Sequence, residues 1–177
     1  MSDAFLKLEI LQDIGHLNLR GDAADQSFLD AVKAVAGSPL PLVPNTVVYG
    51  DQQTCWLGPD EWLLVIPADN VDSTMLALEE TLQGQHASIN DLSGAQLTIR
   101  LTGEKVREML AKGCTLDLYP SVFRAGGCAQ TGLAKANVLI VAHEDGPGVD
   151  LVVRRSFSDY LLHWLRRAGA EYGIEFT

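Results

Sequence analysis

The sequence predicts an α+β domain made of two similar β-α-β-β-β-α halves with largely antiparallel sheets. The first reason is order, because residues 15–84 and residues 96–169 each show a strand, a helix, a loop, three strands and a second helix. The second reason is spacing, since the glycine after the first strand and the serine before the last helix stand about equally far apart in both halves. A period of roughly 80 residues is that of a half-domain rather than of a solenoid repeat. We therefore expect one domain over residues 1–177.

The first half opens with two predicted strands and a helix. Apolar residues alternate with polar ones over residues 6–10 and 16–20, and Gly15 separates the two strands. The helix that follows can take Asp22 or Asp25 as its N-cap, and it ends at the next glycine in the sequence. Its apolar stripe consists of Phe28, Leu29, Val32, Val35 and Ala36.

A proline-rich connection, a hairpin and a second helix complete the first half. Residues 38–44 contain three prolines, which exclude both a helix and a central strand there. Strands are predicted at residues 46–49, 54–57 and 62–66, the last two joined by a Pro-Asp turn. The tryptophans on either side of this turn are more typical of core packing than of a ligand platform. The helix after them takes Asp72 or Ser73 as its cap.

The second half repeats this order. A strand at residues 96–101 leads to a short helix over residues 104–112, which a glycine closes. Three further strands are predicted near residues 128–134, 137–143 and 149–153. The last helix begins at Ser156, where Ser156 and Asp159 form a capping box. Its broad apolar stripe, which we expect to lie in the core, consists of Phe157, Tyr160, Leu161, Trp164, Leu165 and Ala168.

Composition and charge narrow the class of protein. Hydrophobic residues make up 47% and charged residues 20% of the chain, as in ordinary globular proteins. The net charge of −10 lies within residues 1–90, which argues against nucleic acid and anionic membranes as partners. This acidic half serves either solubility or the attraction of a basic partner. The longest apolar runs are too short to span a bilayer and no signal peptide is visible, so we expect a cytoplasmic protein.

No constellation of residues indicates catalysis or metal binding. Cys55, Cys114 and Cys128 lack Cys-x-x-Cys spacing and are interpreted as small buried hydrophobic residues. The histidines stand alone in the sequence, and none lies four residues from another histidine or from a cysteine; they are His16, His86, His143 and His163.

Motifs for nucleophilic or cofactor chemistry are absent as well. Asp91, Ser93 and Ser156 can be combined with a histidine into a triad on paper, but no Gly-x-Ser-x-Gly motif supports it. Phosphate-binding glycine motifs are also missing. We therefore predict no catalytic, cofactor-binding or metal-binding residue on this chain, and the residues alone indicate a binding or structural module.

Several strings and single residues carry a family resemblance. They are residues 56–64 (WLGPDEWLL), 110–118 (LAKGCTLDL), 127–131 (GCAQT), 133–135 (LAK) and 155–157 (RSF), together with Phe123, Tyr160 and Trp164. These strings resemble the gamma subunit of heterotetrameric sarcosine oxidase. The similarity runs from about Leu57 to Glu171, and the strings are long enough to be specific.

The resemblance implies a fold similar to the folate-binding domain of aminomethyltransferase, the glycine-cleavage T-protein. It implies a bacterial complex that oxidatively demethylates sarcosine to glycine with O2, giving hydrogen peroxide and methylene-tetrahydrofolate. In that family FAD, FMN, NAD, tetrahydrofolate and zinc belong to partner subunits. This chain would then be a non-catalytic gamma subunit that packs with alpha, beta and delta subunits, and self-association of the isolated chain is a further expectation.

Two residues within the resemblance need separate interpretation. Asp117 falls where T-proteins keep an aspartate that works on the folate adduct, but residues 133–139 lack the T-protein Gly-Gly-x-x-Asp-Asp turn. A carboxylate without its supporting residues is a poor catalyst, so we interpret Asp117 as a loop cap. The alternatives are a stand-alone folate-dependent aminomethyltransferase-like enzyme and a generic self-associating domain with no enzyme partner. Arg155 is expected either to anchor the large subunit or to hold the strand-to-helix turn.

Overall fold

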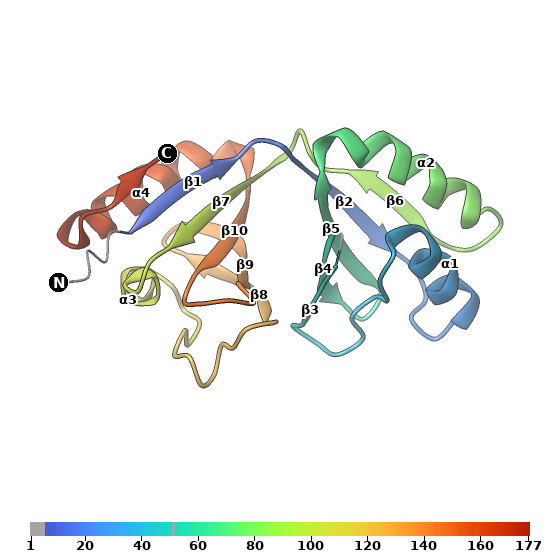
Figure 1. Cartoon of the computed structure of the whole chain (residues 1–177), viewed down its shortest axis with the longest axis horizontal. Coiled ribbons are helices and arrows are strands. Elements are labelled where there is room, and N and C mark those ends of the chain that lie inside the picture. Colours follow the sequence, from blue (N-terminus) through green and yellow to red (C-terminus); the bar gives the residue numbers. More distant parts are fainter. Residues whose placement is uncertain (1–5, 51) are drawn as a thin grey trace. The chain divides into compact units, whose positions relative to one another are not determined.

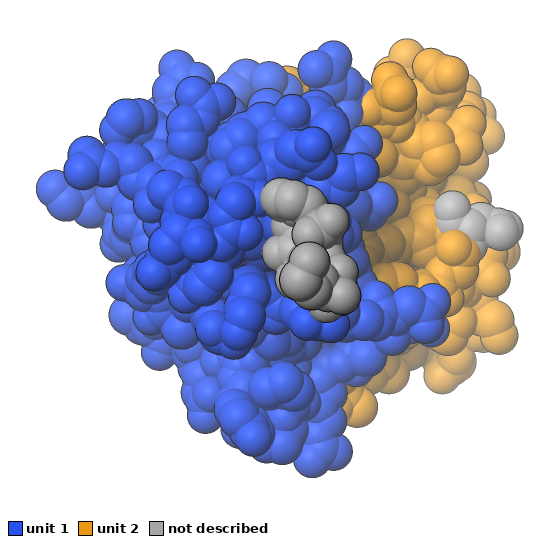
Figure 2. Space-filling view, turned by 60° about the vertical axis from the view of Figure 1, so that its left-hand side comes forward, with its two compact units in different colours: residues 1–12, 95–177 blue, residues 13–94 orange. Residues whose placement is uncertain are grey.

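The computed structural model describes residues 6–50 and 52–177 (Figure 1). The chain divides into two compact units, which Figure 2 colours separately. Of the described residues, unit 1 comprises 6–12 and 95–177, and unit 2 comprises 13–50 and 52–94. Each unit has its own hydrophobic core between a sheet and helices that cover one face of that sheet. The single domain expected over the whole chain stays a prediction.

The described residues of unit 2 form a five-stranded sheet and two α-helices. The strands are β2 (Ile14–Arg20), β3 (Val47–Tyr49), β4 (Gln53–Gly58), β5 (Glu61–Pro67) and β6 (Ser88–Asp91). They lie in the order β3-β4-β5-β2-β6, and each pairing is antiparallel. The helices are α1 (Gln26–Ala36) and α2 (Val71–Thr81), and the 3₁₀ turn η1 (Ala68–Asn70) precedes α2.

The core of unit 2 lies on the helix-covered face of its sheet. Leu17 of β2 is paired with Leu64 of β5, and Trp62 shares that face because side chains alternate along a strand. From α1, the ring of Phe28 packs with its centroid 5.8 Å from that of Trp62. Trp62 also donates from Nε1 to the carbonyl oxygen of Pro41 at 2.8 Å. The buried indole thus holds the proline-rich connection, and it packs in the core as predicted.

Unit 1 is a six-stranded sheet with two α-helices within the part of the chain that the structure describes. Its strands are β1 (Lys7–Leu11), β7 (Gln96–Thr102), β8 (Cys128–Leu133), β9 (Ala136–Ala142), β10 (Val149–Arg154) and β11 (Glu175–Phe176). They lie in the order β11-β1-β7-β10-β9-β8, and only the β1–β11 pairing is parallel among these. The helical segments are α3 (Val106–Ala111), η2 (Arg155–Phe157), α4 (Ser158–Gly169) and η3 (Ala170–Tyr172).

The two units repeat one pattern, which confirms the predicted β-α-β-β-β-α halves. Unit 2 follows the order β2-α1-β3-β4-β5-α2, and unit 1 follows β7-α3-β8-β9-β10-α4. One further strand precedes each pattern along the chain: β1 precedes β2, and β6 precedes β7. Each of these strands pairs with the first strand of the other pattern, because β1 pairs with β7 and β6 pairs with β2. The two repeats therefore exchange their leading strands.

Gly15 lies inside β2 and does not separate two strands, so that prediction was wrong. A Cβ atom at this position would lie 2.1 Å from Cγ2 of Val71 and 2.9 Å from Oγ of Ser93. The strand can therefore pass this close to the first residue of α2 only because position 15 carries no side chain. The interruption between β1 and β2 falls at Gln12 and Asp13 instead.

The starts of α2 and α4 also differ from the predictions. Neither Asp72 nor Ser73 caps α2, which begins after Asn70 without a capping side chain. The capping box of Ser156 and Asp159 does not form, because α4 begins two residues later than predicted and has no side-chain cap. In both places a 3₁₀ turn leads directly into the helix, and its tighter bonding takes up backbone groups that a cap would otherwise satisfy.

The positions of the three cysteines agree with their interpretation as small buried residues. Cys55 and Cys128 are buried, and Cys114 is partly buried against the core of unit 1; all three are free thiols. Within the described residues, no helix has the length and apolar character needed to cross a membrane.

Candidate functional site

The residues that could form a triad on paper do not assemble into one. Ser93 donates from Oγ to Asp91 Oδ1 at 2.5 Å, and His16 contacts the same hydroxyl through its backbone N–H at 3.0 Å. A nucleophilic serine needs its hydroxyl on a histidine that is in turn held by a carboxylate. The hydrogen bonds from Ser93 instead hold the pKa of Asp91 below its ordinary value. Ser156 lies in η2 of the other unit.

Asp117 caps a turn, as predicted. Its Oδ1 accepts a hydrogen bond from the backbone N–H of Tyr119 at 2.9 Å, and the side chain is exposed. The loop behind it is held by Arg107, which donates from Nη1 to the carbonyl oxygens of Leu118 at 2.8 Å and Phe123 at 2.6 Å. Asp117 thus shapes a loop that is also held by the partly buried side chain of Arg107.

Sequence reasoning missed a polar cluster around the buried Asp150 of β10, which joins Arg100 of β7 and His143 directly after β9. Asp150 is 4% exposed and accepts from Arg100 Nε and Nη2, both at 2.9 Å. Its Oδ1 also lies 2.8 Å from Nε2 of His143. Burial raises the pKa of Asp150, but the hydrogen bonds from His143 and Arg100 outweigh it, so the pKa lies below its ordinary value. A carboxylate so fully engaged ties neighbouring strands together and has no free oxygen for a substrate.

Metal-binding groups do not gather in the described part of the chain. No group of three or more His, Cys, Asp or Glu side chains that could hold a metal ion is found in residues 6–50 and 52–177.

Arg155 has a structural position: its Nη2 donates to the carbonyl oxygen of Gln96 at 3.1 Å, and its backbone N–H donates to that of Ala95 at 2.8 Å. Arg155 thereby holds the turn from β10 into α4.

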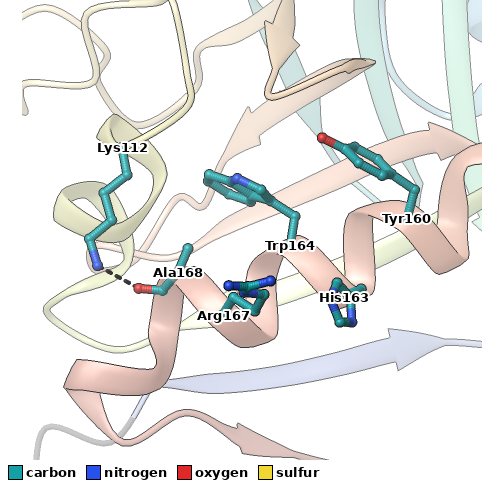
Figure 3. Close-up of a pocket in the computed structure, with 6 residues that line it drawn as sticks. All are labelled: Lys112, Tyr160, His163, Trp164, Arg167 and Ala168. Carbon is teal, nitrogen blue, oxygen red and sulfur yellow. Dashed lines mark hydrogen bonds between the residues drawn. The ribbon is translucent and has the colours of Figure 1, made fainter.

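A pocket of about 440 Å³ lies on the exposed side of α4 (Figure 3). It is lined by Lys112, Tyr160, His163, Trp164, Arg167 and Ala168. Figure 3 shows the rings of Tyr160 and Trp164 side by side along α4, and Lys112 reaching across from the end of α3. The Lys112 ammonium donates to the carbonyl oxygen of Ala168 at 2.5 Å and also pairs with Glu171.

The pocket lies along one edge of the broad apolar stripe of α4, all of which was predicted to lie in the core. Trp164 and Ala168 line the pocket and also pack against the core of unit 1. Leu161 and Leu165 are fully buried against the sheet. Phe157 and Tyr160 are 41% and 38% exposed, so their assignment to the core was wrong. A helix can turn only one side to the sheet, and apolar residues that span a wider arc remain partly in water.

The aromatic side chains of this face are held in place by their neighbours. Gly113 makes room for Trp164, because a Cβ at position 113 would lie 2.5 Å from Cζ2 of the indole. The hydroxyl of Tyr160 accepts from the backbone N–H of Lys135 at 3.3 Å. The two rings therefore present a fixed apolar surface to solvent.

Comparisons with known proteins place this chain in a family. The sequence model of the "Sarcosine oxidase, gamma subunit family" matches residues 20–171. Sarcosine oxidase subunit gamma of Corynebacterium sp. strain U-96 is 31% identical over 148 residues, covering 80% of this chain and 69% of that protein. The Arthrobacter sp. subunit gamma is 31% identical over 147 residues, covering 80% and 70%.

Solved structures give the same picture. A chain of heterotetrameric sarcosine oxidase from Corynebacterium sp. U-96, in complex with pyrrole 2-carboxylate, matches with a TM-score of 0.89 and 27% identity, covering 98% of this chain and 88% of that one. Aminomethyltransferase T of the glycine cleavage system from Bartonella henselae matches with a TM-score of 0.71 and 16% identity, covering 98% and 48%. The second likeness is one of fold alone.

Proposed function

The chain belongs to the sarcosine oxidase gamma subunit family, and from this premise we propose that it assembles with alpha, beta and delta subunits in the bacterial cytoplasm. The complex would oxidise sarcosine with O2, release glycine and hydrogen peroxide, and transfer the one-carbon unit to tetrahydrofolate as methylene-tetrahydrofolate. The observation that carries the proposal is the match to a chain of heterotetrameric sarcosine oxidase across 98% of this chain.

The role of this chain in the complex is to pack and not to catalyse. Its polar clusters support this, because Asp91, Asp117 and Asp150 are each engaged by groups of their own unit. The alternative of a stand-alone aminomethyltransferase is not favoured, since the T-protein likeness is at 16% identity whereas the gamma subunit relatives reach 31%. FAD, FMN, NAD, tetrahydrofolate and zinc would all be carried by the partner subunits.

Assembly is the direct test. A tagged chain co-expressed with the three other subunits should elute with them in one size-exclusion peak at equal stoichiometry. The same chain purified alone should show no flavin absorbance and no zinc by elemental analysis. If the other three subunits assemble and turn over sarcosine while this chain elutes separately, the proposed function is wrong.

Asp117→Asn separates a packing subunit from a folate enzyme. The asparagine Oδ1 can still accept from the N–H of Tyr119, so the turn should persist. We expect methylene-tetrahydrofolate formation by the assembled complex to stay within about twofold of wild type, whereas loss of a general base costs about 10²-fold or more. A drop of that size with unchanged thermal unfolding would favour the aminomethyltransferase alternative.

A further inference from the structure

We propose that the exposed face of α4 is the surface on which this chain receives an acidic segment of another subunit. The inference rests on the proposed function and names the place and chemistry of the contact. We call this face the α4 surface and define it as Phe157, Tyr160, His163, Trp164 and Arg167, with Lys112 at its edge.

The aromatic residues provide the first argument. Tyr160 and Trp164 stand one helical turn apart and line the same pocket, and Phe157 continues the row by one turn in the other direction. Aromatic residues and arginine are enriched in the centres of protein interfaces, where they supply much of the binding energy. Single exposed apolar side chains are common, but a row of three large rings beside an arginine matches the composition of an interface centre.

Charge supplies the second argument and selects the occupant. The chain as a whole carries −10, yet the pocket is lined by two permanent cations and a histidine and by no carboxylate. Lys112 is already paired with Glu171. The Arg167 guanidinium has no hydrogen bond or ion pair within the described residues, so its planar fork is available to a carboxylate.

A partner subunit fits this surface better than a second copy of the chain. Two chains of charge −10 repel each other, which opposes self-association even though one copy could supply carboxylates. Nucleic acid is opposed by the same charge. The occupant we infer is a segment with a carboxylate that reaches Arg167 and an apolar side chain that covers the indole of Trp164.

The α4 surface is also built to stay in one conformation. The hydrogen bond from Lys112 to Ala168 links the end of α3 to the end of α4. The absence of a side chain at Gly113 leaves the space that the indole of Trp164 occupies. Since these contacts form within unit 1 itself, little ordering would be needed when the partner docks.

Charge reversal at Arg167 tests the proposal in the whole complex. A cell expresses the alpha, beta and delta subunits with two versions of this chain, wild type and Arg167→Glu, and intact mass spectrometry measures their ratio in the purified complex. The ratio is corrected for the amount of each soluble chain. We expect incorporation of the variant at least about tenfold below wild type, since one interface arginine commonly carries that much binding energy. Tyr160→Ala should also reduce incorporation.

Lys33→Glu is the matched control. Lys33 is exposed in the last turn of α1, as Arg167 is in the last turn of α4, so both reversals oppose the helix dipole and change the net charge equally. The control should be incorporated like wild type, and both variants should unfold thermally within a few degrees of each other.

The outcomes separate the surface from the function. Equal incorporation of Arg167→Glu and wild type would overturn the α4 surface while the proposed function stands. Absence of the wild-type chain from the complex would overturn the proposed function and the surface with it. If light scattering shows a dimer of the isolated chain that Arg167→Glu dissociates, with incorporation unchanged, the occupant is a second copy and the proposal is wrong.

Discussion

Replacing Asp150 with alanine should lower the free energy of unfolding by about 3 kcal/mol. The carboxylate accepts two hydrogen bonds from Arg100 and lies within hydrogen-bonding distance of His143, and it is almost entirely buried. Removing one partner of a buried pair leaves the other charge uncompensated, which costs more than the pair itself contributes. We place the effect at the low end of the usual range because the Arg100 side chain is 42% exposed and can regain water.

The pH dependence of this effect has a definite sign. The pKa of Asp150 is lowered in the folded chain, so its stabilising contribution is present above the unfolded value of about 3.9 and is lost as the pH falls through the folded value. The difference in unfolding free energy between wild type and Asp150→Ala should therefore shrink below about pH 4.

Urea unfolding over a series of pH values measures both quantities. Asp145→Ala is the control, because Asp145 is exposed in the turn between β9 and β10, and it should change stability by less than about 0.5 kcal/mol. A loss equal to that of the control, or a difference that grows as the pH is lowered below 4, would contradict the structural role assigned to Asp150.

Sequence patterns predicted the strands whose apolar and polar residues alternate, but not all of the sheet. Residues 96–101 were found because apolar and polar residues alternate there, and residues 149–153 because they form a short apolar run. Strand β6 was missed because Ser88–Asp91 holds a single apolar residue, Ile89, and is placed only by its pairing with β2. Tertiary pairing decides such a segment, and no local pattern carries it.

The Asp150 cluster shows a similar limit for sites. Arg100 and Asp150 each stand among apolar residues of a strand, which is a signal that sequence reasoning could have used. Their partnership depends on the register that sets Asp150 opposite Arg100, and 50 residues separate them in the chain. For α4 the pattern was visible but too broad, because periodicity alone does not say which edge of a wide apolar arc faces the sheet.

Two adjacent residues on α4 test this division directly. Leu161→Ala should lower the free energy of unfolding by about 3 kcal/mol, because Leu161 is fully buried and the truncation leaves a cavity. Tyr160→Ala should cost less than about 1 kcal/mol, since the ring is 38% exposed and its hydroxyl makes one long hydrogen bond of 3.3 Å.

Denaturant unfolding of the isolated chain at neutral pH compares the two variants under one condition. Unchanged slopes with urea would show that both variants unfold from equally compact native states, so that the midpoints report stability alone. Similar losses of unfolding free energy for the two variants would place Tyr160 in the core and would contradict its position on the exposed edge of α4. The expected result assigns one side of α4 to the fold. The aromatic side of α4 then has no large stabilising role within unit 1. Reduced incorporation of the Tyr160→Ala variant into the assembled complex would therefore report on docking and not on folding.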